Sequence, residues 1–342
     1  MPWFYRKNEG EKKITYMLKR VLKQIRRRHA IKKAFLGDYR SYCRWEYNNP
    51  DNRCREAMEA RMLRLSHVLE KGMSLSAPKP GFGVAKAEEL ITQVRQYHEQ
   101  TDPEGISSVA RNAVGVLGAY LRFHSQRGFT PKTIEDGYHA LLALYPESGE
   151  TYGIEETTSL AMMEAAHGTL PEVMESRHSV RQFRQQPVSS EDVKKAVALA
   201  MRAPSACNRQ SCKAYFYQDP RINEEIGKLI PGNSGFSQDV PNYIVITGSQ
   251  SAFYDAFERN QVYIDGGLFT MALVEALHYY GIGSCILQNG EIEERNALYK
   301  EICGNIAANE KIILFIAVGY YPERFSYALS HRKNIEDVLK IK

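Results

Sequence analysis

Two polar runs, separated by about the length of one helix, constrain the fold of this chain more than any other feature. The first is Ser-Arg-His-Ser-Val-Arg-Gln-Phe at 176–183, and the second is Arg-Ala-Pro-Ser-Ala-Cys-Asn-Arg-Gln at 202–210. Between them, Ser189 or Ser190 can cap a helix, and the acids that follow suit its positive end. The apolar stripe of this helix consists of Val193, Val197, Ala200 and Met201. We expect the helix to fold the two runs back toward each other, into one pocket.

The side chains of these runs favour a particular kind of ligand. Arg177 and Arg181 come from the first run, and Asn208 and Gln210 from the second. Guanidinium groups bind phosphate through paired hydrogen bonds, while an amide offers both a donor and an acceptor to a heterocycle. The sequence therefore predicts a ligand that has both a phosphate and a polar heterocycle.

These runs and two later segments resemble the nitroreductase-like flavoproteins. That family opens with Arg-Arg/His-Ser-x-Arg-x-Phe and continues, a helix later, with Ala-Pro-Ser-x-x-Asn-x-Gln, as residues 177–183 and 203–210 do here. Asp-Gly-Gly at 265–267, before a long apolar helix, and Val-Gly-Tyr-Tyr-Pro at 318–322, before a basic tail, also fit. The resemblance covers about residues 170–342. It departs at Ser211-Cys212, where the family often has Pro-Trp, so the packing beneath the flavin is expected to differ.

The resemblance implies FMN and a set of residues that bind it. Arg177 and Ser179 would meet the phosphate and ribityl chain, and Arg332 or Lys333 would add a second cation. Pro204, Ser205 and Asn208 would lie along the isoalloxazine ring. The complete implied set is Arg177, His178, Ser179, Arg181, Pro204, Ser205, Asn208, Gln210, Arg332 and Lys333.

The resemblance implies no catalytic side chain. A backbone amide near Asn289 and Gly290 would meet the flavin N5, and the glycine would allow close approach. Phe253, Tyr254 and Phe257 stand where the family places substrate-facing residues, although core packing is an equal alternative for them.

By the same resemblance, the protein would be an FMN-dependent oxidoreductase that passes hydride from NAD(P)H through FMN to a small-molecule acceptor. The family is typically a homodimer with FMN at the subunit interface. The segment 265–280 is apolar on more than one face, which suits the centre of a dimer or, alternatively, of a monomeric core. A rival function is a flavin-binding or scaffold protein with little turnover, recruited to a membrane glycan assembly.

The length of 342 residues suggests two domains of α+β class. The expected organisation is a basic amphipathic arm (1–36), a helical N-terminal domain (37–150), a linker with one helix at 154–167 (151–175), and a nitroreductase-like domain (176–342). That last domain would hold a mostly antiparallel sheet flanked by helices. Helices are predicted near 55–71, 85–100, 107–125 and 131–144, and strands near 213–218, 243–248, 284–288 and 311–320.

His67 and Glu70 share one helix face three residues apart, just before Gly72. They could bind a metal or shuttle protons, whereas the simpler interpretation is a helix that ends at a capping glycine. The segment is similar to His-x-x-Glu-Lys-Gly stretches that precede nitroreductase-like domains in some bacterial polysaccharide gene products. This looser resemblance implies a link to cell-surface polysaccharide synthesis.

The net charge of +5 conceals a basic N-terminus. Residues 1–33 hold twelve Lys/Arg and two Glu, whereas the remainder holds 33 basic and 38 acidic residues. The arm could pack on its own protein or a dimer mate, lie on an anionic membrane, or hold nucleic acid, although no nucleic-acid reading motif accompanies it. Its apolar residues at helical spacing are Ile14, Met17, Leu18, Val21, Leu22 and Ile25.

The remaining sequence signals indicate a reducing compartment. The six cysteines form no CxxC pair and no Cys/His finger spacing, so reduced thiols without a structural metal are expected. No segment approaches the roughly 20 apolar residues of a membrane span, and no signal peptide is visible. The predicted location is the cytoplasm, with contact at the inner face of the membrane if the arm binds lipid.

Overall fold

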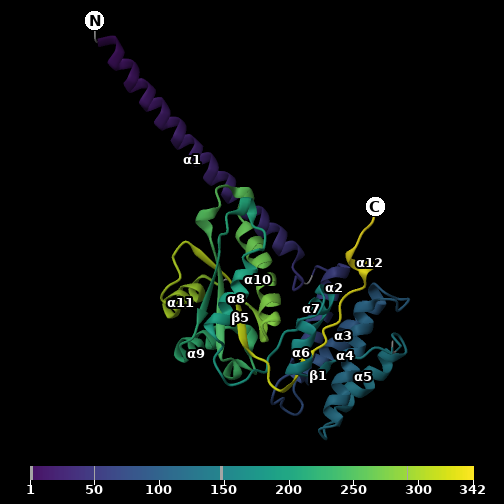
Figure 1. The fold of residues 1–342 in the computed structure, drawn as a ribbon. Helices are drawn as coiled ribbons and strands as arrows, with labels where there is room; N and C mark the ends of the chain where they lie inside the picture. The colour runs from purple at the N-terminus through teal and green to yellow at the C-terminus, as the bar shows by residue number, and fades with distance from the viewer. Residues whose placement is uncertain (1–2, 50, 147–148, 291) are drawn as a thin grey trace.

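The computed structural model of the protein describes residues 3–49, 51–146, 149–290 and 292–342, with side chains from residue 12 onward. An extended N-terminal helix, a helical unit and a sheet domain follow one another along the chain (Figure 1). No helix in this described part combines the length and hydropathy of a membrane span.

A single helix, α1 (Trp3–Trp45), forms the arm and extends well beyond the body of the molecule (Figure 1). Near its C-terminal end it contacts η5 (Ala256–Glu258), where Asp38 accepts hydrogen bonds of 2.6 and 2.7 Å from Arg259. The apolar side chains predicted for the arm are all exposed. They therefore do not pack on the described remainder of the same chain, which removes one of the alternatives for this helix.

Four helices form the unit after the arm: α2 (Arg55–Met73), α3 (Val84–Gln100), α4 (Ser108–Ser125) and α5 (Lys132–Leu142). The predicted helices are confirmed within a few residues, and Pro131 is the N-cap of α5 rather than its first helical residue. Gly72 lies inside α2, which ends one residue later at Met73, so it is not a capping glycine. Its lack of a side chain instead makes room for the Phe82 ring, which a Cβ would meet. The four helices share a core of their own, whose fully buried members include Met62, Leu65, Leu69, Leu90, Val94, Leu117, Tyr120, Ile134 and Leu141.

A four-stranded antiparallel sheet forms the centre of the C-terminal domain, in the order β2-β3-β5-β4. Its strands are β2 (Cys212–Tyr217), β3 (Asn242–Ser249), β4 (Ile282–Gln288) and β5 (Glu310–Tyr320). Both central strands, β3 and β5, are largely buried because helices cover both faces.

The two faces of the sheet carry different helices. Apolar residues of α8 (Ser190–Ala200) and α10 (Gln261–Tyr279) pack on the face that includes Ile244 and Ile316. On the opposite face, which includes Val245 and Phe315, lie α9 (Pro220–Leu229) and α11 (Glu293–Cys303). The prediction of an α+β fold, with an antiparallel sheet flanked by helices and preceded by helices, is confirmed.

The segment predicted as a linker is structured throughout. It holds β1 (Ile154–Thr158), α6 (Ser159–Ala166) and α7 (Leu170–Ser176). The predicted helix at 154–167 is wrong over its first five residues, because β1 pairs antiparallel with β6 (Arg324–Ala328). A partner about 170 residues away overrides the local helical signal. After β6 the chain continues along α2 to the short helix α12 (Ile335–Val338), so it ties the sheet domain to the helical unit.

Candidate flavin site

The first polar run lies at the β4 edge of the sheet. Val180 donates its backbone N–H to the Ser284 carbonyl at 2.9 Å, and Ser179 forms a parallel bridge to the same residue. Phe183 packs directly on Gly319 of β5, where a Cβ would approach the Phe183 side chain to 2.7 Å. The run is therefore fixed by backbone pairing on one side and by an aromatic anchor on the other.

Both arginines of this run have donors without partners. Arg181 is 4% exposed, and its Nε, like the buried Nε of Arg177, has no hydrogen-bond partner among the described residues. Burial lowers the pKa of Arg177, and the positive charge of Arg332, a predicted tail cation, adds to that effect. Buried cationic donors without acceptors are costly, and an anionic ligand would satisfy them.

A buried histidine orients the start of the run. His278, at the C-terminal end of α10, lies 2.9 Å from Ser176 Oγ through Nε2 and 2.6 Å from Tyr321 Oη through Nδ1. Burial, then Arg177 and His178, lowers the pKa of His278 to about 4. The ring is neutral at pH 7, so it fixes the run by hydrogen bonding. His178 itself stacks on Tyr327 of β6, with ring centroids 3.8 Å apart.

The helical unit reaches the same region through buried carboxylates. Glu70 accepts 3.3 Å hydrogen bonds from the backbone N–H and the Oγ of Ser330, and burial raises its pKa. Lys333 pairs with Glu59, another buried carboxylate of α2. Of the two predicted tail cations, Arg332 adds to the lowering of the Arg177 pKa and donates its Nη1 to the Ser330 carbonyl at 2.6 Å, whereas Lys333 is used to join the domains.

The predicted metal or proton role of the His67–Glu70 pair finds no geometric support. His67 is exposed, whereas Glu70 is buried against Ser330. Among the described residues, no three His, Cys, Asp or Glu side chains gather as metal ligands. The motif instead connects the domains, since Lys71 also donates to the Gly232 carbonyl at 2.9 Å.

The second polar run forms a strained loop after α8. Cys207, Asn208 and Gln210 have positive φ angles of 51°, 54° and 49°. Left-handed conformations at residues other than glycine cost roughly 1–3 kcal/mol each and persist only where the surroundings impose them. The 3₁₀ turn Ala206–Asn208 lies within this loop.

Three contacts hold that strained loop in place. Ala206 donates its N–H to both carboxylate oxygens of the buried Asp265, at 3.2 and 3.3 Å. Arg209 forms a two-pronged ion pair with Glu258, at 2.5 and 3.1 Å, and stacks over Phe253 at 4.8 Å. The Oγ of Ser205 accepts the N–H of Gln210 at 3.0 Å, so the loop is closed on itself.

A cavity of about 380 Å³ opens beside this loop. Its wall is more apolar than polar and comes from α8, the loop, β2 and the start of α10. Of the predicted ring-binding residues, Pro204, Ser205 and Gln210 line it, while Asn208 is exposed and does not line it. Asp265 and Phe269 complete the wall.

The structure does not bring the two runs into one pocket. Ser176 bonds His278 near one end of α10, and Ala206 bonds Asp265 near the other. These helix positions are 13 residues apart, which corresponds to about 20 Å along the axis. The runs also lie at opposite edges of the sheet, with β3 and β5 between β4 and β2. The expectation of a shared pocket within one chain is therefore wrong, because α8 spans the sheet instead of folding the runs together.

The remaining predicted positions are placed as follows. Asn289 is buried and donates to Asn296 and to the Ile312 carbonyl, and Gly290 has φ 76°. Tyr254 and Phe257 are exposed and form an edge-to-face pair 5.7 Å apart, so they are not core residues. Phe253 is half-buried beneath Arg209.

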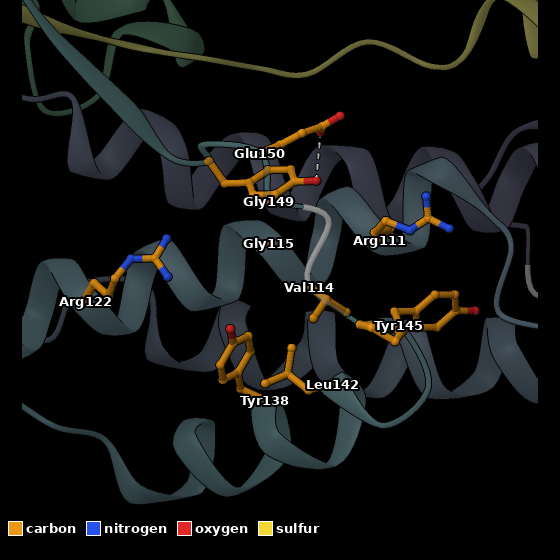
Figure 2. A pocket seen from close by; sticks show the side chains of 11 residues that line it. Arg111, Val114, Gly115, Arg122, Tyr138, Leu142, Tyr145, Gly149 and Glu150 are labelled. Carbon is orange, nitrogen blue, oxygen red and sulfur yellow. Dashed lines mark hydrogen bonds between the residues drawn. The ribbon is translucent and has the colours of Figure 1, made fainter.

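A second cavity, of about 210 Å³, lies within the helical unit and away from both runs. Figure 2 shows Arg111 and Arg122 on either side of Gly115 along α4, above Tyr138 and Leu142 of α5. It contains none of the residues that the sequence indicated for flavin binding.

Sequence reasoning missed two supporting residues of the site, His278 and Glu258, which act on the runs from more than 45 residues away. Tyr321, which bonds His278, lies in the recognised segment 318–322 but was given no role of its own. The only sequence signal for them is a polar side chain within an apolar segment, such as His278 in the long apolar helix.

The comparisons with known proteins concern this C-terminal domain. The model of the nitroreductase family matches residues 174–233, which include both runs. A nitroreductase family protein from Streptococcus pneumoniae is 22% identical, with a TM-score of 0.42 over 51% of this chain and 100% of that one. An FMN-dependent nitroreductase from Clostridium difficile is 18% identical, with a TM-score of 0.39 over 48% of this chain and 92% of that one. No curated protein matches the sequence. The C-terminal part of the chain thus carries a nitroreductase-family segment, at residues 174–233.

Proposed function

We propose that this protein is an FMN-dependent oxidoreductase whose flavin site is assembled from two copies of the chain. The observation that carries the proposal is the pair of arginines, Arg177 and Arg181, whose buried Nε donors have no partner. They lie inside the segment that matches the nitroreductase family. The FMN-dependent nitroreductase among the similar structures supports the choice of flavin.

The described residues suit both the phosphate end and the ring end of FMN. The phosphate would meet Arg177, Ser179 and Arg332, because charge-assisted bonds would satisfy the orphaned donors. The isoalloxazine would lie in the mostly apolar cavity beside Pro204 and Ser205. When bound, FMN would supply the redox chemistry of the site, and the protein would bind and orient it.

The separation of the two runs favours a site shared between chains. Since about 20 Å of α10 lies between their anchoring points, the phosphate end of one chain would need the ring-binding loop of another. The face of α10 that remains exposed can supply the contact, because it presents Ile264, Leu268 and Met271 in one stripe. A two-fold interface of this kind would create two equivalent sites.

Complementation between variants tests this arrangement. In a heterodimer of Arg177→Ala with Ser205→Ala/Gln210→Ala, one site would carry both lesions and the other none. Co-expression of the two variants should therefore restore about a quarter of the wild-type FMN content and NAD(P)H oxidation, given random pairing. Each variant alone should restore almost none.

Three outcomes would contradict different parts of the proposal. No complementation, with an active wild type, would show that each chain builds its own site. A wild-type protein that retains no flavin after FMN is added and the excess removed would end the flavin function itself. A yellow protein that NAD(P)H does not reduce would favour the rival, a flavin-binding or scaffold protein with little turnover.

The proposal extends to the reductant, location and setting. NAD(P)H is proposed as reductant on the family resemblance, and a small molecule as acceptor. A cytoplasmic location is supported by the six free cysteines. A role in cell-surface polysaccharide synthesis rests only on the short segment 67–72, and a test is whether loss of the gene product alters surface glycans.

A further inference from the structure

We propose that α1 is a membrane-surface helix that docks this protein on anionic lipid. The inference is independent of the flavin function, because every flavin residue lies beyond residue 170. The inference is based on α1, which extends beyond the rest of the molecule (Figure 1) and exposes a stripe of apolar side chains.

The stripe is continuous on one side of the helix. At 3.6 residues per turn, the apolar residues between 14 and 25 fall on one side, over about 17 Å of axis. Each of their side chains is roughly half exposed or more, from 49% at Val21 to 65% at Met17. Large apolar side chains gathered in this way mark an interaction surface. The stripe consists of Ile14, Met17, Leu18, Val21, Leu22 and Ile25.

Charge identifies what the stripe meets. Residues 12–33 contain ten Lys/Arg and no Asp or Glu, and none of these cations pairs with another residue that the structure describes. Between residues 12 and 27 the cations occupy the side opposite the stripe. An apolar face backed by a cationic face is the pattern of helices that lie in the interface of an anionic membrane. These cations are Lys12, Lys13, Lys19, Arg20, Lys23, Arg26 and Arg27.

Other occupants fit the surface less well. A second α1 laid along the stripe would bring two segments of ten positive charges together, which repel each other. The body of the protein, although net acidic, contacts α1 only near its C-terminal end. Nucleic acid would use the cations but would leave the apolar stripe in water.

The attachment of α1 connects the arm to the strained loop. Asp38 binds Arg259, which follows η5, and Glu258 of η5 holds Arg209 of the strained loop. Docking of the arm would therefore tether the sheet domain through the element that also holds this loop.

Co-sedimentation of the full-length protein with vesicles tests the proposal. Vesicles of phosphatidylcholine with about one third phosphatidylserine should bind the protein at low salt, and pure phosphatidylcholine should bind it at least tenfold more weakly. Binding should also fall when salt is raised from about 0.1 M to 1 M, because the Debye length shortens from about 10 Å to 3 Å.

Neutral substitutions separate insertion from simple charge attraction. Leu18→Gln/Leu22→Gln should weaken binding at least tenfold, whereas the control Thr15→Gln/Tyr16→Gln, outside the stripe, should stay within threefold of wild type. Helical content and FMN content should be unchanged in both.

Three results would overturn the inference. They are no sedimentation of the wild type at low salt, equal binding by the stripe variant and the control, or tight binding to duplex DNA that the stripe variant retains. The first two leave the flavin function untouched, because FMN content is measured on the same samples.

Discussion

Arg177 combines partial burial, an Nε without a partner and a neighbouring cation, Arg332. In water this arrangement is unfavourable, because two guanidinium groups repel and a buried donor goes unsatisfied. An anion between them would reverse both effects. We therefore propose that Arg177 is a binding group and that a bound anion would offset the cost of its burial.

Arg177→Ala should therefore weaken FMN binding by about ten- to a hundredfold, the equivalent of roughly 1.5–3 kcal/mol for a charge-assisted contact. The exposed Arg184, seven residues further along the chain, provides the control, and Arg184→Ala should leave the affinity unchanged. Fluorescence titration with FMN measures both. Equal affinities for wild type and Arg177→Ala would show that the phosphate binds elsewhere.

The buried His278 should make the protein sensitive to mild acid. Its pKa is about 4 in the folded protein and 6.5 in the unfolded reference, so the unfolded state binds more protons between these values. The free energy of unfolding should therefore fall as the pH drops from 6.5 to 4, by up to about 3 kcal/mol for this residue.

Urea unfolding at pH 7, 5.5 and 4.5 measures this loss, and His278→Gln should make the free energy of unfolding depend less steeply on pH. Part of the pH dependence should remain, because burial also lowers the pKa of His178 to about 4. The exposed His139, replaced by Gln, serves as the control. An equal pH dependence of the free energy of unfolding in the wild type, His278→Gln and His139→Gln would contradict the lowered pKa of His278.

At the scale of elements, the strained loop at 206–210 depends on contacts from α10 and η5. Asp265 holds its start, and Glu258 holds Arg209 with the carboxylate nearly buried. The loop keeps its left-handed residues because these contacts fix the backbone on both sides.

Arg209→Ala should destabilise the protein, because Glu258 loses its ion-pair partner and keeps only the Tyr254 N–H. The matched control is Lys195→Ala, which removes an exposed ion pair with Asp192 on α8 and should have a much smaller effect. Chemical denaturation compares the two. FMN affinity should fall only in Arg209→Ala. Equal stability of the two variants would argue against a structural role for the ion pair between Arg209 and Glu258.

The sequence indicated local elements well and long-range ones poorly. The cap at Ser189, the four strands of the main sheet and the helices of the N-terminal unit follow from periodicity and capping, which act within a few residues. β1 was predicted as helix because its partner, β6, is distant in sequence. Likewise, both polar runs were recognised, but the length of α10 between them could not be derived from their spacing.

At the scale of the whole molecule, α10 leaves one stripe of apolar residues uncovered within a single chain. Leu199 of α8 and Met201, the C-cap of that helix, are further exposed apolar side chains. Surfaces of this kind are characteristic of subunit interfaces. The second copy would cover the stripe and bring the ring-binding loop to the arginines.

Light scattering should therefore report about 78 kDa, twice the chain mass of 39.0 kDa, at micromolar concentration. Leu268→Glu/Met271→Glu should shift the mass toward 39 kDa and lower FMN content at least tenfold, since each site would lose half its residues. Ile106→Glu, on an exposed loop of the helical unit, should change neither. A wild-type mass of 39 kDa with flavin bound would contradict the shared site.

The contact between Glu70 and Ser330 also has a consequence for synthesis of the chain. The two residues are separated by 260 positions, so at about 5–20 residues per second the carboxylate emerges roughly 10–50 s before its partner. Glu59 is likewise synthesised long before its partner, Lys333. The helical unit is therefore made first, but two of its buried acids stay without their final partners until β6 has followed. During translation, this unit would complete its packing only after the sheet domain has been made.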